Sequence, residues 1–285
     1  IADYTEAIQI DPKYSSAYVS RGVARWETNE YDKAFDDYTE AIRLDPNNTT
    51  AYTNRGNIWS AKTEFDKAIT DYTQAIRLDP KVANAHYNRG VAWANMKMYD
   101  KAQTDFDSAL SINSKDTDSL TARGIVWNLK KNYFKAITDF DAVLELDPNS
   151  AYAQAHRARA FMKLKKYDDA VAGFEKSLEL NPMDWVFSQY SKFRSSCPEA
   201  KYRDGKKAVE LAKKALENAG KDATWNYLDA LAMAHAESGD FELAVGEQRK
   251  AIDLLKAEKA PDADDLKQAE ARLELYQAEK PYREE

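Results

Sequence analysis

The stretch YTEAIRLDP at residues 38–46 returns 34 residues later as YTQAIRLDP at residues 72–80, and the chain opens on a third version, IADYTEAIQIDP. Aligned at this step, the chain shows columns of a single residue type. The columns hold proline at Pro12, Pro46, Pro80, Pro148 and Pro182, glycine at Gly22, Gly56, Gly90 and Gly124, alanine at Ala34, Ala68, Ala102, Ala136 and Ala170, and an aromatic residue at Tyr38, Tyr72, Phe106, Phe140 and Phe174. A sustained period of this length indicates stacked repeats that share one core.

Each period predicts two helices. The segments TAYTNRGNIWSAK and EFDKAITDYTQAIRL both place apolar or small residues at i, i+3, i+4 and i+7, the spacing of an amphipathic helix. Glycine and alanine remove side-chain bulk where two antiparallel helices cross, so that the aromatic residue four positions after the alanine can fill the space. Proline ends the second helix. We expect an all-α solenoid of stacked antiparallel helix pairs.

This arrangement closely resembles the tetratricopeptide repeat (TPR), which has a small residue at position 8, an aromatic residue at 11, alanine at 20, an aromatic residue at 24, a small residue at 27 and proline at 32. The resemblance implies a right-handed α-solenoid, the TPR superhelix. Five regular repeats are predicted over residues 15–184, a divergent repeat with an enlarged turn between its helices over 185–224, another repeat over 225–258, and a capping helix over 262–280. Residues 1–14 match only the second helix of a repeat.

The two ends carry further expectations. Because residues 1–14 lack a partner first helix, we expect the chain to be cut from a longer array, and the uncovered apolar face predicts possible self-association. The last part, with CPEAKYRDG at residues 197–205 and KPYRE at 280–284, resembles the end of certain bacterial TPR proteins.

Composition argues against several functions. The formal net charge of −7 is spread along the chain, which predicts no nucleic-acid partner, and no apolar run is long enough for a membrane. The three histidines stand at different repeat positions and Cys197 is the single cysteine, so no metal site is predicted. No phosphate-binding glycine loop or nucleophile motif occurs. We predict no catalytic residue, no enzyme and no cofactor; the compartment stays open, with a soluble cytoplasmic protein favoured.

Two further columns are each open to two interpretations. Arginine holds position 7 in five repeats and aspartate holds position 23 in four, which favours a structural ladder of surface ion pairs, worth about 0–1 kcal/mol each, over a track for a ligand. The tryptophan column at position 11 favours a place in the core over base stacking. Trp26 departs from it by one position and is either a binding anchor or a shifted core residue.

The family resemblance implies that the first helices line a concave groove, with positions 2, 5, 6, 9, 12 and 13 facing it. The candidate binding residues there are Trp26, Thr53, Asn54, Asn57, Asn84, Tyr87, Asn88, Asn95, Asn128, Tyr152, His156 and Arg159. Asparagine amides can pair with the backbone of an extended peptide, although they can also be merely solvated. The lysines and asparagines that clamp an acidic C-terminus in chaperone-binding repeats are absent apart from the asparagine at position 6.

These observations favour a protein-interaction scaffold that binds an extended segment of a partner protein in its groove. The alternative is a recruiting or oligomerising region of a larger multidomain protein whose activity lies elsewhere. An RNA-binding solenoid ranks third because the chain is acidic overall.

Overall fold

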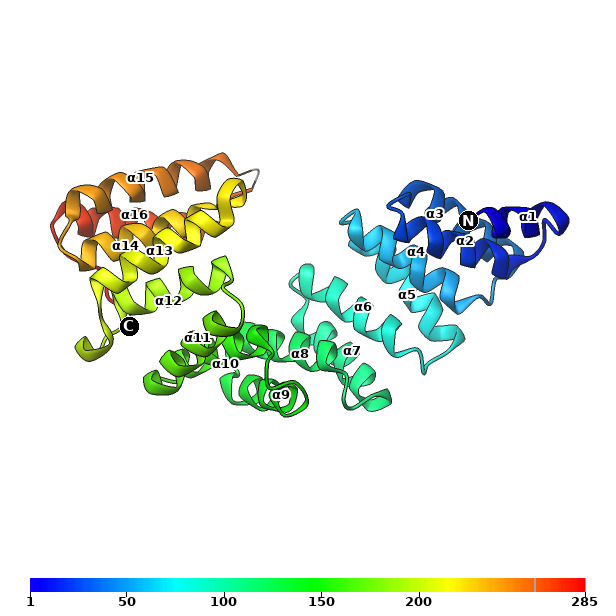
Figure 1. Ribbon diagram of the computed structural model, residues 1–285, viewed down its shortest axis with the longest axis horizontal. Helices are drawn as coiled ribbons and strands as arrows, with labels where there is room; N and C mark the ends of the chain where they lie inside the picture. Colours follow the sequence, from blue (N-terminus) through cyan, green and yellow to red (C-terminus); the bar gives the residue numbers. More distant parts are fainter. Residues whose placement is uncertain (259, 285) are drawn as a thin grey trace. The chain divides into compact units, whose positions relative to one another are not determined.

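The computed structural model describes residues 1–258 and 260–284, which form sixteen α-helices, two short 3-10 helices and no strand (Figure 1). The chain divides into two compact units, Ile1–Leu146 and Asp147–Glu285. The first unit contains α1 (Ala2–Ile10), α2 (Ser15–Glu27), α3 (Tyr31–Leu44), α4 (Thr49–Ala61), α5 (Phe65–Leu78), α6 (Ala83–Asn95), α7 (Tyr99–Ile112), α8 (Thr117–Leu129) and α9 (Tyr133–Leu146). The second contains α10 (Ala151–Lys163), α11 (Tyr167–Leu180), α12 (Asp184–Ser196), α13 (Gly205–Ala219), α14 (Trp225–Glu237), α15 (Phe241–Ala257) and α16 (Ala263–Gln277), with 3-10 turns at Ala200–Tyr202 and Gly220–Asp222.

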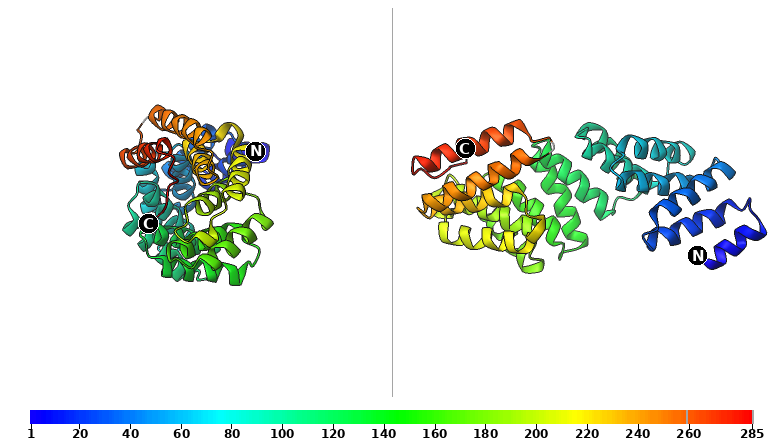
Figure 2. Two further views of the ribbon diagram at one scale, coloured as in Figure 1. Left: turned by 90° about the vertical axis from the view of Figure 1, so that its left-hand side faces the viewer. Right: turned by 90° about the horizontal axis from the view of Figure 1, so that it is seen from above.

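Within each unit the helices pack as consecutive pairs. In the first unit, α2 packs against α3, α4 against α5, α6 against α7 and α8 against α9, while α3 also contacts α4, α5 contacts α6 and α7 contacts α8. The rows of paired helices can be followed by colour in Figure 2. In the second unit, α10 packs against α11, α12 against α13, and α14 against α15, which α16 then covers. The predicted all-α fold of stacked antiparallel helix pairs is confirmed.

The glycine column makes room for the aromatic column. An ideal Cβ atom at Gly56 would stand 2.6 Å from Cε1 of Tyr72, and the same contact recurs between Gly90 and Phe106 at 2.7 Å. In the fifth pair the glycine lies on the second helix instead of the first. Ala158 stands in the glycine column, and Gly173 on the facing helix lacks a Cβ atom, which would lie 2.8 Å from that of Ala158. The packing role predicted for these columns is confirmed.

A second device of the repeat, absent from the sequence-based expectations, is the turn between the two helices of a pair. At its fifteenth position the backbone is left-handed, with φ between 58° and 62° at Asn29, Thr63, Lys97, Lys131 and Lys165. Left-handed backbone is costly for residues that carry a Cβ atom. Only at the same place in the α14–α15 pair does the chain use a glycine, Gly239, with φ 84°.

The arginine column forms a structural ladder, as the sequence favours. Arg55 donates two hydrogen bonds of 2.8 Å to the two carboxylate oxygens of Asp71 and a third, of 3.4 Å, to the hydroxyl of Thr39 on the preceding pair. The same scheme joins Arg21 to Asp37 and Thr5, Arg89 to Asp105 and Thr73, and Arg123 to Asp139 and Asp107. Each of these arginines therefore ties its own pair to the previous one.

One expectation about this ladder is wrong. The carboxylates are not on the surface: Asp71 is 4% exposed and Asp37 only 2%. Burial raises the pKa of Asp139 although Arg123 opposes it, and the hydrogen bonds to Asp71 raise the pKa of Arg55. Because an unpaired buried charge is costly, each pair matters more than an exposed one.

The second unit departs from the regular repeat in two places. Between α12 and α13 the chain makes a long turn in which Cys197 is 1% exposed and packs with Phe193 and Tyr202, and burial raises the pKa of its thiol. The capping helix α16 buries Ala269 and Tyr276 completely. Both features belong to the core of this unit.

A buried carboxylate joins four helices of the second unit. Asp229 on α14 accepts hydrogen bonds of 2.8 Å from Lys192 on α12, 2.8 Å from Arg272 on α16 and 3.1 Å from Gln248 on α15. Burial works against its charge, but Lys192 and Arg272 hold the pKa of Asp229 below its ordinary value. This network fixes α16 to the helix pairs before it.

Candidate functional site

The first helices of neighbouring pairs come closest to each other in the first unit. α2 contacts α4, α4 contacts α6, and α6 contacts α8, whereas no two neighbouring second helices make contacts as extensive. A stack of pairs curves toward the side on which its helices approach more closely, so this side is the inner face. The predicted binding residues lie on these first helices and on α10.

Several of the predicted asparagines are hydrogen bonded within the protein. The side-chain oxygen of Asn57 accepts a bond of 2.8 Å from the hydroxyl of Tyr72 and one of 2.9 Å from the amide of Asn88. Burial raises the pKa of Tyr38 to about 12, while its hydrogen bond to Asn54 opposes the rise. These amides link successive pairs, so they are neither simply solvated nor wholly available to a ligand.

Other predicted residues on α6 face the surrounding space more fully. Asn84 and Asn95 are exposed, and the Asn95 amide donates to the carbonyl of Val91 at 2.9 Å. Tyr87 is half-buried, with its ring 6.0 Å from that of Phe106. α6 thus presents exposed amides at its two ends, with Asn88 half-buried between them.

Two predicted residues of the first unit do not project into a groove. Thr53 is 7% exposed and its hydroxyl bonds the carbonyl of Thr49 in its own helix at 3.0 Å. Trp26 packs against the cluster of Ala34, Tyr38 and Ile58. This packing favours the shifted core residue among the two interpretations of Trp26. Asn128 lies half-buried on α8.

In the second unit three rings from α10 and α12 pack together. The ring centroids of Tyr152 and His156 are 4.5 Å apart, and those of His156 and Trp185 are 4.8 Å apart. His156 is 7% exposed, and burial together with nearby Arg159 lowers its pKa to about 3. The prediction that His156 offers a surface contact is wrong, because the neighbouring rings cover it; Tyr152 alone of the two remains exposed.

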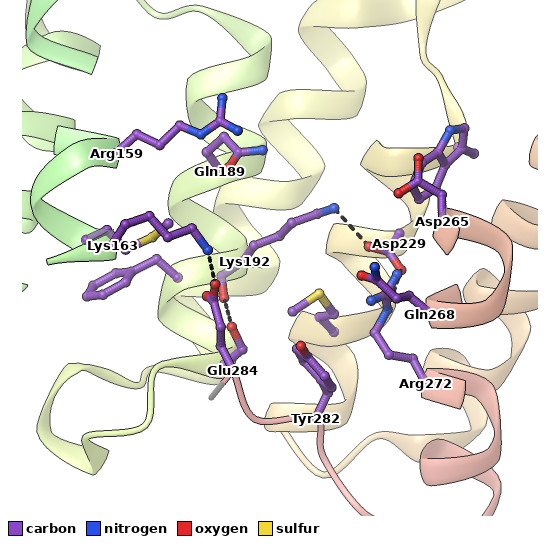
Figure 3. Close-up of a pocket in the computed structure, with 15 residues that line it drawn as sticks. Arg159, Lys163, Gln189, Lys192, Asp229, Asp265, Gln268, Arg272, Tyr282 and Glu284 are labelled. Atoms are coloured by element: carbon purple, nitrogen blue, oxygen red, sulfur yellow. Dashed lines mark hydrogen bonds and ion pairs between the residues drawn. The ribbon is translucent and has the colours of Figure 1, made fainter. Parts of the chain in front are cut away.

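A pocket of about 230 Å³ opens in the second unit beside Arg159, the last of the predicted residues (Figure 3). Its walls come from α10, α12, α14 and α16 and from residues 280–284. The charged and polar groups that line it include Arg159, Lys163, Gln189, Lys192, Asp265 and Gln268. Arg159 and Lys163 hold positions 9 and 13 of the fifth repeat, both among the positions that the family resemblance turns toward the groove, although only Arg159 is among the predicted binding residues. The others lie in the divergent repeat or in the capping helix, where the repeat pattern gives no signal.

Residues 280–284, here called the 280–284 segment, run from the end of α16 back to α12 (Figure 3). The backbone NH of Glu284 donates to the carbonyl of Ser196 at 2.9 Å, and its carboxylate pairs with Lys163. Arg283 pairs with Glu237 at 2.6 Å. Arg203 pairs with the same Glu237 at 3.1 Å, so the RDG and KPYRE sequences, far apart in the chain, meet at one carboxylate.

The described residues contain no group of three or more histidine, cysteine or acidic side chains placed to hold a metal ion. None of the helices in the described ranges is long and apolar enough to span a bilayer. The thiol of Cys197 is buried and its pKa is raised, which works against a nucleophilic role.

Comparison with family models identifies the repeats directly. A model described as TPR repeat matches residues 25–63 and 61–97, and two models described as tetratricopeptide repeat match residues 83–116 and 131–184. Together these matches span just over half of the chain. No curated protein sequence matches it.

Solved structures with the same fold are numerous but distant in sequence. A tetratricopeptide repeat protein from Parabacteroides merdae has a TM-score of 0.70 at 19% identity, with 92% of this chain and 98% of that one covered. YrrB, described as a TPR protein with an unusual peptide-binding site, has a TM-score of 0.56 at 22% identity, with 64% and 94% covered. PilF of Pseudomonas aeruginosa has a TM-score of 0.63 at 16% identity, with 75% and 94% covered. At these identities the likeness concerns the fold.

Proposed function

Because the chain belongs to the tetratricopeptide repeat proteins, a family of protein-interaction scaffolds, we propose that it binds an extended segment of a partner protein along the inner faces of its first helices. The row of amides on the inner face carries the proposal. Asn84 and Asn95 are exposed, and Asn88 lies half-buried between them and donates its amide to Asn57. Such amides can donate to and accept from the backbone of a peptide without selecting its side chains.

The proposal gains support from YrrB, whose structure is described as having a peptide-binding site on the same fold. It predicts no catalytic activity for the described residues. Binding along an array of repeats spreads the contact over several helices, so no single amide is expected to supply most of the affinity.

The experiment uses the whole chain as bait, followed by identification of captured proteins by mass spectrometry. Asn84→Ala combined with Asn95→Ala removes exposed amides that do not link helix pairs, and it should lower capture of the specific partner severalfold. Asn54→Ala with Asn88→Ala should do the same, but a melting curve must accompany it because Asn88 also bonds Asn57.

Asn47→Ala serves as the control, since Asn47 is exposed in the turn before α4 and away from the inner face. Unchanged capture by both double variants would contradict the groove assignment.

A second candidate function is self-association through α1, as a recruiting or oligomerising region. Ile10 is 80% exposed, and Tyr4 and Ile1 are exposed at 40% and 44%. Exposed apolar side chains on one helix favour contact with a second copy of the chain. Light scattering at increasing concentration tests this: Ile10→Lys should shift the chain toward the monomer, and an unchanged mass would contradict it.

We also propose that the residues around Glu237 form the cap shared with bacterial TPR proteins that end in KPYRE. The support is the meeting of Arg203 and Arg283 at its carboxylate. Glu237→Gln should therefore destabilise the second unit in thermal unfolding, whereas Glu217→Gln, an exposed change on α13, should not.

A further inference from the structure

The pocket of the second unit is closed on one side by the chain itself. Three consecutive residues of the 280–284 segment, Tyr282, Arg283 and Glu284, each contact the surface formed by α10, α12, α14 and α16. The segment is not part of a helix. It therefore lies against the first helices of this unit in the manner of an extended peptide.

The contacts are those that a groove makes with a separate peptide. A backbone NH of the segment donates to the carbonyl of Ser196 at the end of α12. The ring of Tyr282 lies under the guanidinium of Arg272, 5.6 Å from centroid to Cζ, and packs beside Met233. The carboxylate of Glu284 pairs with Lys163 on α10. One aromatic and one acidic side chain, two positions apart, thus occupy two separate subsites.

The segment is only partly buried. Tyr282, Arg283 and Glu284 are all partly exposed, and the Lys163 and Glu284 side chains are 38% and 33% exposed. Exposed pairs of this kind contribute little to stability. A separate peptide that offers an aromatic ring and a carboxylate in the same places can therefore displace the 280–284 segment.

The charge of the pocket favours an acidic occupant. Lys192 and Arg272 share the single buried carboxylate of Asp229, so this trio keeps a net positive charge. Lys163 has Glu284 as its partner, and Arg159, which lines the same pocket, forms no ion pair within residues 1–258 and 260–284. Removal of the segment leaves two uncompensated cations one turn apart on α10.

We propose that the groove of the second unit binds an extended partner segment carrying an aromatic residue followed two positions later by an acidic one, and that the 280–284 segment occupies this groove until the partner displaces it. The inference rests on the proposed scaffold function and adds the chemistry of the partner and a built-in competitor. Lys163 and Arg159 bind the acidic group, and the surface beside Arg272 and Met233 binds the aromatic ring.

The test measures binding of a fluorescein-labelled peptide with the sequence EKPYRE, that of residues 279–284, by fluorescence anisotropy. The unchanged chain should bind it weakly. Glu284→Lys in the whole chain places a cation against Lys163 and should tighten peptide binding by roughly tenfold, as should deletion of residues 280–284. Glu242→Lys, an exposed change of the same charge on α15, should leave binding as it was.

The acidic subsite is tested by charge reversal. The peptide EKPYRK should lose roughly tenfold in affinity for the Glu284→Lys chain, and Lys163→Glu in the segment-deleted chain should restore its binding. If neither Glu284→Lys nor the deletion tightens binding, or if peptide charge has no effect, the proposal is wrong. Loss of the folded state on deletion, seen by circular dichroism, would show that the segment is structural and would equally overturn it.

These outcomes are separable from those of the scaffold proposal. The latter is tested through Asn84 and Asn95 on α6 in the first unit, which none of these variants touches. Capture of a partner that survives every change at Lys163 and Glu284 would leave the scaffold standing and remove only the competing segment.

Discussion

Gly56 lies directly beneath the ring of Tyr72, so closely that a Cβ atom at Gly56 would stand 2.6 Å from Cε1 of the ring. Gly56→Ala should therefore lower the free energy of unfolding by roughly 1–3 kcal/mol, because the ring or the helices must shift. Urea unfolding followed by circular dichroism measures this. The control is Gly246→Ala on α15, where nothing lies within 4 Å; it should stabilise by about 0.5–1 kcal/mol through helix propensity. Equal effects at both sites would contradict the crossing argument.

The left-handed turns predict a gain in stability. Lys131 has a φ of 59°, a conformation that costs a residue with a Cβ atom roughly 1–2 kcal/mol. Lys131→Gly should raise the melting temperature, whereas Lys131→Ala, which keeps the Cβ atom, should not. Gly239→Ala should lower the melting temperature, because a residue with a Cβ atom is strained in left-handed backbone. No atom lies within 4 Å of the added methyl group, so a steric clash does not contribute. A Gly239→Ala variant as stable as the parent would count against this account.

The buried ladder predicts an asymmetry between ion pairs. Asp71→Asn leaves the Arg55 guanidinium without its carboxylate at a site where the aspartate is 4% exposed, and it should cost about 3 kcal/mol in unfolding free energy. Glu40→Gln breaks an exposed pair with Arg43 on the surface of α3 and should cost below about 1 kcal/mol. The denaturant midpoints of the two variants, measured under the same conditions, test this. Similar small losses of unfolding free energy in both would show that burial does not strengthen the Arg55–Asp71 pair.

His156 predicts a dependence of stability on pH. Its folded pKa is lowered to about 3 from an ordinary value of 6.5, so between these values the unfolded chain binds a proton that the folded chain does not. Stability from this group is complete above pH 6.5 and falls as the pH drops toward 3, by up to about 1.4 kcal/mol per pH unit. NMR should show no titration of the His156 ring between pH 5 and 8; titration near 6.5 would contradict its burial.

Features that recur as a column of one residue type could be predicted from the sequence. The left-handed turn also recurs, but its column mixes Asn29 and Thr63 with lysines and was not predicted. The fold, the contact of Gly56 with Tyr72 and the pairing of Arg55 with Asp71 each appear in several copies, so a column reveals them. Thr53 and His156 were misplaced because the repeat position gives only the approximate side of the helix on which a residue lies. Whether the neighbouring helix pair covers that side cannot be read from the position. Their burial depends on packing between pairs.

Most of the pocket of the second unit was beyond the repeat pattern. Arg159 was predicted from its position in a regular repeat, and Lys163 holds another groove-facing position of the same repeat. Its partner Glu284 lies 121 residues further along the chain and belongs to no repeat column. Trp185 and Lys192 lie in the divergent part, where the enlarged turn disturbs the period and the sequence gives no position from which to infer a facing direction.

The short connection between α16 and the 280–284 segment fixes how a competitor must behave. Only Ala278 and Glu279 separate the helix from the segment, and a tether of this length holds a bound group at an effective concentration on the order of millimolar. That local concentration does not change when the protein is diluted. The tethered segment therefore weakens the apparent affinity of every external ligand for this groove by the same factor, whatever the concentration of the protein. How much partner the groove binds is then set by the partner's affinity and not by the concentration of the chain.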